Sequence, residues 1–320
     1  MRAGGRSGSI GRWQDWRRRD SCRSIDSPPP LTGASLRRRI GRRPWANHDW
    51  RSVVRTLEGI ALADVQAVYD GAEGDLWELV MGEQIHIGGL SSSMELADRA
   101  GIAEGSRGVD LCCCNGAGMR FLVRFRNVAH MTGVDATERI VDRGRRRTAE
   151  EDLSDSVEFV LGDATDTGLA DASFDFAWGE DAWCYVEDKS RLIREATRIV
   201  RPGGRIAFTD WVTGSAKMSD QEAERYLRFM KFPNVLSVDD YRRQLEECGC
   251  EVEAAEDTGR FPSHVDLYLD MLNKQLTYDA LKLIGFDMAL MQSLGGEMVF
   301  VQQLAHDNKI CQGRFVATTA

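Results

Sequence analysis

The chain has 320 residues and a formal net charge of -9 at pH 7, which is long enough for one domain of roughly 250 residues with a large core. The charge is uneven, because residues 1–50 hold twelve Arg and four Asp, a net charge of +8, so that the remainder carries about -17. An acidic body repels phosphate backbones, which argues against nucleic acid as a partner, and no apolar run reaches the roughly 18 residues of a membrane helix.

The eight cysteines are scattered, and three of them stand in a row at Cys112, Cys113 and Cys114. No disulfide framework of a small secreted domain explains this spacing, so we expect reduced thiols and a cytoplasmic location. Cys248 and Cys250 have no partners at zinc-finger spacing, and the sequence predicts no metal site.

Residues 1–55 combine Arg, Ser, Gly and a run of three prolines without a helical or strand period. This composition predicts a disordered, Arg-rich leader. A transit peptide, an upstream start codon or an arm that contacts a second copy would each explain it, and a homodimer stays open. Residues 56–320 are predicted to form one domain.

The periodicity of this domain alternates between strands and helices. A helix is expected from about 57 to 79, followed by a loop over 81–89 and a helix over 92–100. Further along, the pattern predicts strands at 108–113, 130–135, 157–162, 174–178, 205–210, 251–256 and 313–319, with helices at 119 onward, 137–149, 189–200, 219–231 and 238–248. A helical insert of about 263–305 precedes the last strand. Such alternation indicates an α/β fold with a doubly wound, mostly parallel seven-stranded sheet and a helical cap.

Polar or small residues stand where the predicted strands end, which is where an open parallel sheet binds its ligand. The first strand carries Asp110 and runs into Cys112 and the turn around Gly116, where a backbone can approach a bound group. About 20 residues on, Asp135 ends the second strand, and an acid there accepts hydrogen bonds from vicinal ribose hydroxyls. Each acid could also be a helix cap or a surface residue.

The third and fourth strand ends complete this series. Asp163 and Ala164 follow the third strand, and an acid there suits an exocyclic adenine amine. Glu180 follows the fourth strand and is assigned to the same cofactor site. The signatures at the first three strand ends, in register with the Arg201-Pro202-Gly203-Gly204 turn ahead of a later strand, are far more specific than a lone glycine turn.

These residues, together with the Arg201-Pro202-Gly203-Gly204 turn, resemble the motifs of class I S-adenosylmethionine-dependent methyltransferases, in order and spacing along about 100 residues. The resemblance implies S-adenosylmethionine as cofactor and a small molecule as methyl acceptor. It departs from the family at Cys112 and Cys114, where many members have Gly; both residues are small and apolar enough for the turn to survive.

The segment from Met81 to Gly89, the stretch from Asp110 to Leu122 and the helical insert are similar to those of sarcosine and dimethylglycine N-methyltransferases. This similarity implies a small amine such as sarcosine or dimethylglycine as acceptor, while O-, S- and C-methylation of another metabolite stay open. Among the catalytic candidates, His86 is a base for a hydroxyl acceptor or a satisfied loop histidine, and Tyr185 stands where some relatives have His.

Aromatic residues near the last parallel strand ends are candidates for the acceptor site. Trp183 and Trp211, with Tyr185, would attract a developing ammonium through cation–π forces, although each can also be a packing residue. Arg225 would bind a substrate carboxylate, or it lies on a solvated helix face.

Three other functions are weighed. A dinucleotide dehydrogenase would need a glycine loop for a pyrophosphate, which Asn115-Gly116-Ala117-Gly118 does not supply. Amino-methylation of nucleic acid would need a Pro-Pro turn after the fourth strand, and the chain's Pro-Pro run is at 28–30. A protein that binds the cofactor without transferring its methyl group remains as an alternative, because of Cys112 and Cys114.

Overall fold

The computed structural model describes residues 55–320. The leader predicted for residues 1–55 falls almost wholly outside them and stays a prediction. Within residues 55–320, no helix combines the length and the apolar character needed to cross a membrane. Nor does that part of the chain bring three or more His, Cys, Asp or Glu side chains together in a way that could hold a metal ion.

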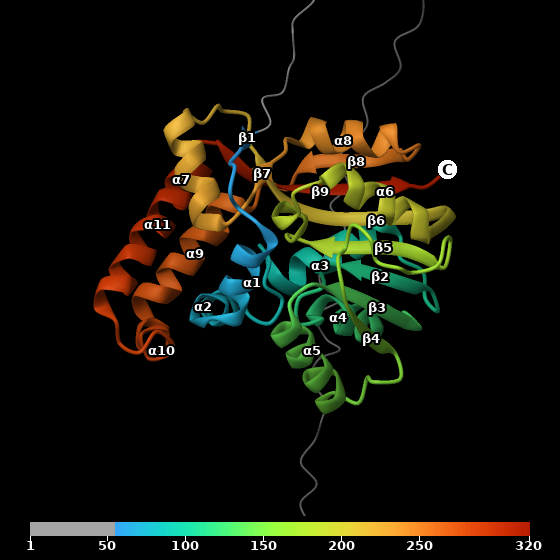
Figure 1. The fold of residues 1–320 in the computed structure, drawn as a ribbon, viewed down its shortest axis with the longest axis horizontal. Coiled ribbons are helices and arrows are strands. Elements are labelled where there is room, and N and C mark those ends of the chain that lie inside the picture. The colour runs from blue at the N-terminus through green and yellow to red at the C-terminus, as the bar shows by residue number, and fades with distance from the viewer. Residues whose placement is uncertain (1–54) are drawn as a thin grey trace, which may run out of the picture. The chain divides into compact units, whose positions relative to one another are not determined.

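The centre of the fold is a seven-stranded sheet in the order β4-β3-β2-β5-β6-β9-β8 (Figure 1). Strands β2 to β6 pair in parallel, and β9 runs antiparallel to both β6 and β8. The expected doubly wound, mostly parallel sheet is therefore confirmed. Its strands are β2 Arg107–Leu111, β3 His130–Asp135, β4 Val157–Leu161, β5 Phe174–Glu180, β6 Val200–Thr213, β8 Glu251–Asp257 and β9 Ile310–Thr318, and a separate small pair joins β1 Arg55–Thr56 to β7 Asn234–Val235.

Strand β9 begins three residues earlier than its apolar pattern predicts, at Ile310 rather than Gly313. The reason is the length of β6, because β9 pairs with it from Arg205 opposite Thr318 to Thr213 opposite Ile310. The extra residues extend the antiparallel edge toward the cap.

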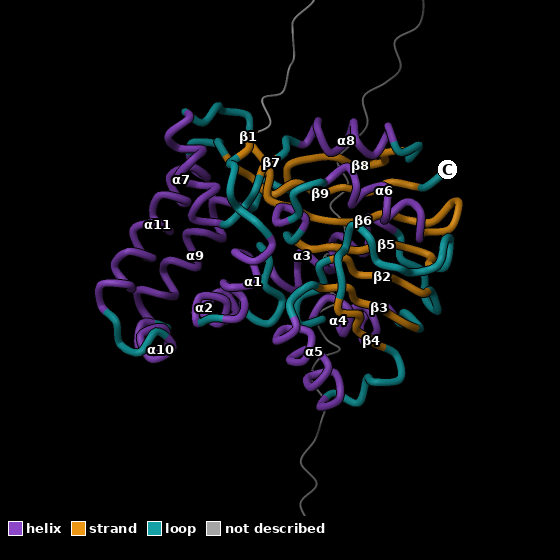
Figure 2. Tube along the Cα trace, viewed as in Figure 1, coloured by secondary structure: helices purple, strands orange, loops and turns teal. Residues whose placement is uncertain are grey.

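Helices cover both faces of the sheet (Figure 2). Two separate hydrophobic clusters line these faces, one with residues of α6 and α8 and one with residues of α3, α4 and α5. The inner strands are apolar along nearly their whole length, as expected for strands buried on both sides. The helices of this layer are α3 Gly89–Ala100, α4 Ala117–Arg126, α5 Glu138–Glu150, α6 Lys189–Ile199 and α8 Val238–Glu247.

A third hydrophobic cluster lies in a helical cap beyond the carboxyl ends of the parallel strands (Figure 1). Ser219 starts its α7 with a capping box to Glu222, as the sequence pattern favours. The insert predicted before the last strand is present as three helices. The cap consists of α1 Leu62–Asp70, α2 Ala72–Met81, α7 Asp220–Met230, α9 Phe261–Lys274, α10 Thr277–Leu283 and α11 Met288–His306.

The first predicted helix, over about 57–79, is in fact two. Gly71 has an extended backbone and ends α1 while starting α2. The chain turns tightly there, since a Cβ on Gly74 would lie 2.8 Å from the Cα of Tyr69. Apolar spacing alone continues through this corner, which is why the period did not reveal it.

Candidate active site

The carboxyl ends of β2, β3, β4 and β5 border two adjoining pockets under α1. The larger has a volume of about 310 Å³, and the smaller of about 50 Å³ lies beside it. Both are lined by Tyr69, Cys112, Cys114 and Ala182, so one elongated ligand can occupy both. The site lies at the switch point, where β3 and β5 flank β2 on opposite sides.

The larger pocket contains the acids predicted at the second and third strand ends. Asp135 accepts hydrogen bonds from the backbone N–H groups of Cys114 and Thr137, each at 2.9 Å. Burial raises the pKa of Asp135, and these backbone donors oppose the shift. Asp163 and Ala164 line the same pocket, so the structure brings together all three residues expected around an adenosine.

The turn after β2 holds two cysteines in a backbone conformation that favours glycine. The φ angle is 65° at Cys112 and 49° at Cys114, which costs an L-residue about 1–2 kcal/mol. The N–H of Cys112 donates to Val134 at 2.9 Å and that of Cys114 to Asp135, which fixes the turn. Burial raises the pKa of both thiols, so they line the pockets as small neutral groups.

Gly116 has a different role from that expected. It lies outside the lining of both pockets, and a Cβ there would lie 2.4 Å from the Phe159 ring. Its φ of 75° places it at the start of α4. The residue therefore permits close packing of α4 against β4 and shapes the turn indirectly.

Three polar atoms lie around Gly118, which lines the smaller pocket together with Asp110 and Glu180. A Cβ on Gly118 would lie 2.8 Å from Oε2 of Glu180, 3.4 Å from Nε1 of Trp178 and 3.5 Å from Oδ2 of Asp110. Burial raises the pKa of Asp110, and the charges of Glu180 and Asp135 add to the shift. The Trp178 Nε1 is buried without a hydrogen-bond partner among the described residues.

This arrangement is complementary to the ammonium of an α-amino acid, because two carboxyl groups that line the smaller pocket can accept hydrogen bonds from it. With Asp135, Asp163 and Ala164 lining the adjoining pocket, the residues present fit S-adenosylmethionine. Asp110 and Glu180 would hold its methionine end.

His86 lines the smaller pocket and contacts one of its acids. Its Nε2 lies 3.3 Å from Oε1 of Glu180 and 3.2 Å from Oγ of Ser93. Ser93 also donates to Glu180 at 2.6 Å. The imidazole is therefore engaged with the carboxylate of Glu180, in a buried position.

Tyr185 lines the larger pocket and meets a second tyrosine there. Tyr69 donates a hydrogen bond to its hydroxyl at 3.1 Å, and the two rings meet edge to face with centroids 5.8 Å apart. Burial raises the pKa of both phenols. Tyr69 is not among the residues expected from the sequence, because it falls within a helical period where an aromatic residue suggests only packing.

Three residues proposed for the acceptor lie elsewhere, which corrects that part of the sequence analysis. Trp183 is fully buried, stacks on Phe208 at 4.0 Å and donates to the carbonyl of Leu111 at 3.2 Å. Its ring fills space left by Gly179, where a Cβ would lie 2.4 Å from Nε1. Trp183 is therefore a core residue.

Trp211 and Arg225 also lie outside both pockets. Trp211 is buried in the cap and packs edge to face against Phe261, with centroids 4.7 Å apart. Arg225 is exposed, pairs with Glu297 at 3.0 Å and lies 4.1 Å above the Phe300 ring. Its charge is satisfied within the cap.

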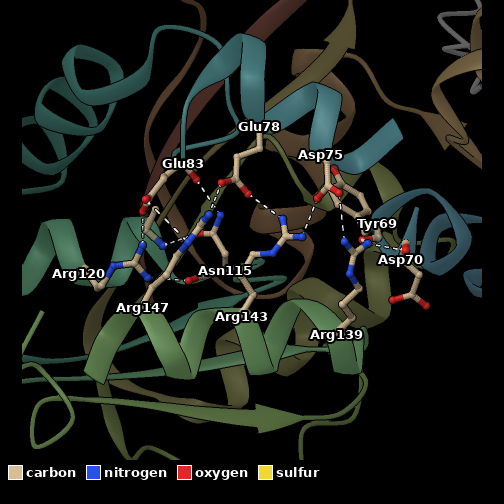
Figure 3. A network of polar contacts seen from close by, with 11 residues as sticks. Tyr69, Asp70, Asp75, Glu78, Glu83, Asn115, Arg120, Arg139, Arg143 and Arg147 are labelled. Carbon is tan, nitrogen blue, oxygen red and sulfur yellow. Dashed lines mark hydrogen bonds and ion pairs between the residues drawn. The ribbon is translucent and has the colours of Figure 1, made fainter. Parts of the chain in front are cut away.

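A network of ion pairs joins α2 of the cap to α5, which packs on the sheet (Figure 3). Arg143 of α5 contacts Asp75 at 2.6 Å and Glu78 at 2.9 Å, both on α2. Arg139 and Arg147 of the same helix extend the network to Asp75 and Glu78. Because α1 precedes α2 directly and lines the larger pocket, these pairs hold α1 in place.

Residues 109–208 match the family model described as a methyltransferase domain. A curated relative, the 27-O-demethylrifamycin SV methyltransferase of Amycolatopsis mediterranei (strain S699), is 34% identical over an alignment of 207 residues, and the match covers 60% of this chain and 75% of the relative. The glycine/sarcosine/dimethylglycine N-methyltransferase of Actinopolyspora halophila is 27% identical, and the match spans 61% of this chain and 36% of that protein.

Among solved structures, the fold is similar to Haemonchus contortus phosphoethanolamine N-methyltransferase 2, in complex with phosphomonomethylethanolamine and S-adenosylhomocysteine. The TM-score is 0.70 at 19% identity, and the match covers 79% of this chain and 58% of that one. At this identity the likeness concerns the fold. The chain spans less than two thirds of the length of the Haemonchus protein and of the Actinopolyspora relative.

Proposed function

This chain belongs to the S-adenosylmethionine-dependent small-molecule methyltransferases, and we propose that its acceptor reacts through an uncharged amine nitrogen. We assign the ribose of the cofactor to Asp135, the adenine to Asp163 and Ala164, and the methionine end to Asp110 and Glu180. When bound, S-adenosylmethionine supplies a methyl group that is activated by a positively charged sulfur.

The tyrosine pair in the larger pocket carries the proposal for an amine. Burial keeps Tyr69 and Tyr185 protonated at neutral pH, so neither phenol is suited to remove a proton from an acceptor. A neutral amine needs no base. The faces and oxygens of the two phenols would instead stabilise the positive charge that grows on nitrogen.

Sarcosine and dimethylglycine are small members of this acceptor class, and the Actinopolyspora relative is named for both. Their carboxylates would need a cation in the site. Arg225, expected in that role, is paired with Glu297. The amine is thus better supported than the carboxylate.

His86 is proposed to act as a positioning residue. Its contacts with Glu180 and Ser93 orient the carboxylate that we assign to the methionine ammonium. Loss of the imidazole should therefore raise the KM for the cofactor more than it lowers kcat.

A hydroxyl acceptor is the second candidate, because the relative with 34% identity is named as a methyltransferase of 27-O-demethylrifamycin SV. That reaction needs a base to remove the hydroxyl proton, which contributes on the order of 10²–10⁴-fold to the rate. His86 is the residue of the site suited to that role, if its contact with Glu180 opens.

A mass-spectrometric screen of amines, alcohols, phenols and thioethers, with S-adenosylhomocysteine as the common product, tests the proposal. We expect transfer to amines, a His86→Ala effect mainly on the cofactor KM, and a lower kcat for Tyr185→Phe. Two results together would overturn the proposal of an amine acceptor. The acceptor found would be a hydroxyl compound, and His86→Ala would slow its turnover on the order of a hundredfold or more, as expected for the loss of a base. Cofactor binding without product from any acceptor would identify a protein that binds the cofactor without using it.

A further inference from the structure

The cap contains a second cavity, of about 320 Å³, within the size range of small-molecule sites, on the order of 300–1,000 Å³. It lies among the helices grouped at the left of the sheet in Figure 1. Its wall is mainly apolar and comes from four helices and the start of a fifth: Glu73, Leu76, Trp77 and Val80 of α2, Phe229 of α7, Leu269, Leu272 and Asn273 of α9, Thr277 of α10, and Met291, Gln292, Leu294, Gly295 and Met298 of α11.

Two helices line this cavity with complete stripes. The residues of α2 stand at positions 73, 76, 77 and 80, and four of those of α11 at 291, 294, 295 and 298. Positions spaced by three and four share one helix face. The cavity is therefore bounded by matched faces of α2 and α11, and Trp77 packs near Phe229 at its side, with ring centroids 6.5 Å apart.

One position in this wall, Gly295, has no side chain. Gly295 lies in the stripe of α11, and a Cβ added to it would meet nothing within 4 Å. In a helix interior, glycine is less favourable than alanine by about 1 kcal/mol. Gly295 thus leaves space in the cavity at a cost in helix stability.

The larger pocket and the cap cavity are lined by two consecutive helices, α1 and α2. Leu62, Val65 and Tyr69 of α1 line the larger pocket, and α2 follows after Gly71. Tyr185, also in that pocket, packs against the same hydrophobic cluster as Trp77 and Phe229. The larger pocket therefore follows α1 and the cap cavity follows α2, the two helices of one hairpin, and residues of both linings pack against one hydrophobic cluster.

Glu73 lies at the end of the cavity next to the corner between α1 and α2. It is the ionisable residue of the wall, and it starts the α2 stripe next to the corner. Burial raises the pKa of Tyr185, and the charge of Glu73 is among the smaller contributions, which places the carboxyl group within electrostatic reach of that phenol. An ionisable group at this end and a mainly apolar wall, in which Asn273, Thr277 and Gln292 are the uncharged polar residues, match a molecule with one polar head and an apolar body.

We propose that this cavity binds the apolar body of the methyl acceptor, so that the substrate is an amine carrying a hydrocarbon group rather than a small amino acid. The inference rests on the proposed function, since it places the reacting nitrogen beside Tyr69 and Tyr185. Glu73 would accept a hydrogen bond from a polar group near that nitrogen. The walls of the cavity would select by shape and by apolar area.

This proposal predicts a chain-length dependence. Each methylene that passes from water into the cavity should raise kcat/KM about fourfold, until the cavity is full. The series from N,N-dimethylethylamine to N,N-dimethyloctylamine is suitable, because its members differ in apolar length while their nitrogen basicity is similar. The full 320-residue chain is assayed with S-adenosylmethionine at constant pH.

Two glycine variants separate the cavity from general effects. Gly295→Leu should flatten the chain-length dependence by filling the cavity. Gly296→Leu is the matched control, because Gly296 is the next residue of α11, lies outside the cavity wall, and has nothing within 4 Å of an added Cβ. Both variants gain the same helix propensity, and melting curves check that both fold.

The outcomes distinguish this inference from the proposed function. Equal kcat/KM along the amine series, or the same length dependence in Gly295→Leu and Gly296→Leu, would overturn the cavity proposal and leave amine methylation intact. If no amine is methylated, the proposed function fails, and calorimetry with N,N-dimethyloctylamine on protein loaded with S-adenosylhomocysteine decides for the cavity. Binding that Gly295→Leu weakens at least tenfold relative to Gly296→Leu supports it, and no binding to the parent protein refutes it.

Discussion

The pockets at the strand ends and the cavity in the cap differ in the physical means by which they can bind a ligand. At the strand ends, Asp110, Asp135 and Glu180 present carboxylate oxygens, and backbone N–H groups hold Asp135 at 2.9 Å. In the cap, apolar side chains of four helices surround an open space. Hydrogen bonds are directional, whereas apolar burial depends mainly on area.

This contrast indicates which half of the site tolerates change. A polar group that loses its partner in a buried site costs the full desolvation of that group, so the strand ends suit a single cofactor. Adding or removing one methylene in an apolar wall changes the binding free energy only by the small contribution of that methylene. The cap is therefore the half in which relatives of this fold can differ in acceptor.

The strongest effect is expected from a pair of tryptophans. Trp183 is fully buried in the core and hydrogen-bonded to Leu111, so Trp183→Leu should lower the free energy of unfolding by about 3 kcal/mol. Trp77 lines the cap cavity and is partly exposed, so Trp77→Leu should cost about 1 kcal/mol or less. Urea unfolding followed by circular dichroism measures both. Equal losses would mean that the cap is packed as tightly as the core.

The next effect concerns Asp135. Asp135→Ala should weaken cofactor binding by roughly 1.5–3 kcal/mol, because two ribose hydroxyls lose a charged acceptor. Titration calorimetry with S-adenosylmethionine measures the change. Asp142→Ala, an exposed acid on α5, is the control. An affinity within twofold of the parent would remove Asp135 from the ribose site.

A weaker effect on cofactor binding is expected from the ion pairs between α5 and α2. Arg143→Gln removes the pairs with Asp75 and Glu78 and should weaken cofactor binding about fivefold, near 1 kcal/mol for partly buried pairs, by loosening α1. Burial would raise the pKa of Asp75, but hydrogen bonds from Arg143 and Arg139 lower it overall, which agrees with a real charge interaction.

Salt provides an independent check on this junction. Added salt should weaken cofactor binding to the parent more than to Arg143→Gln, because it screens the same pairs. Arg146→Gln, at an exposed position of the same helix, should behave as the parent does. If cofactor binding to the parent and to Arg143→Gln depends equally on salt, the ion pairs do not contribute to holding α1 over the larger pocket.

Local pattern in the sequence was enough to place the sheet and the acids at its strand ends. Asp110, Asp135 and Asp163 could be assigned because strands of a parallel sheet end along one edge, so position in the chain is enough to bring them together. The insert before β9 was also visible, since a long helical period interrupts the strand pattern. These features depend on local period and spacing.

Which aromatic and charged side chains face the site became visible only in three dimensions. Trp183 turns into the core beside Gly179, Trp211 packs into the cap, and Arg225 finds Glu297 on a helix far along the chain. The left-handed backbone at Cys112 and Cys114, the pairing of Tyr69 with Tyr185 and the cavity between α2 and α11 were equally out of reach. Each of these depends on contacts between segments distant in sequence, and the period of a helix or strand says which face is apolar but not which partner will cover it.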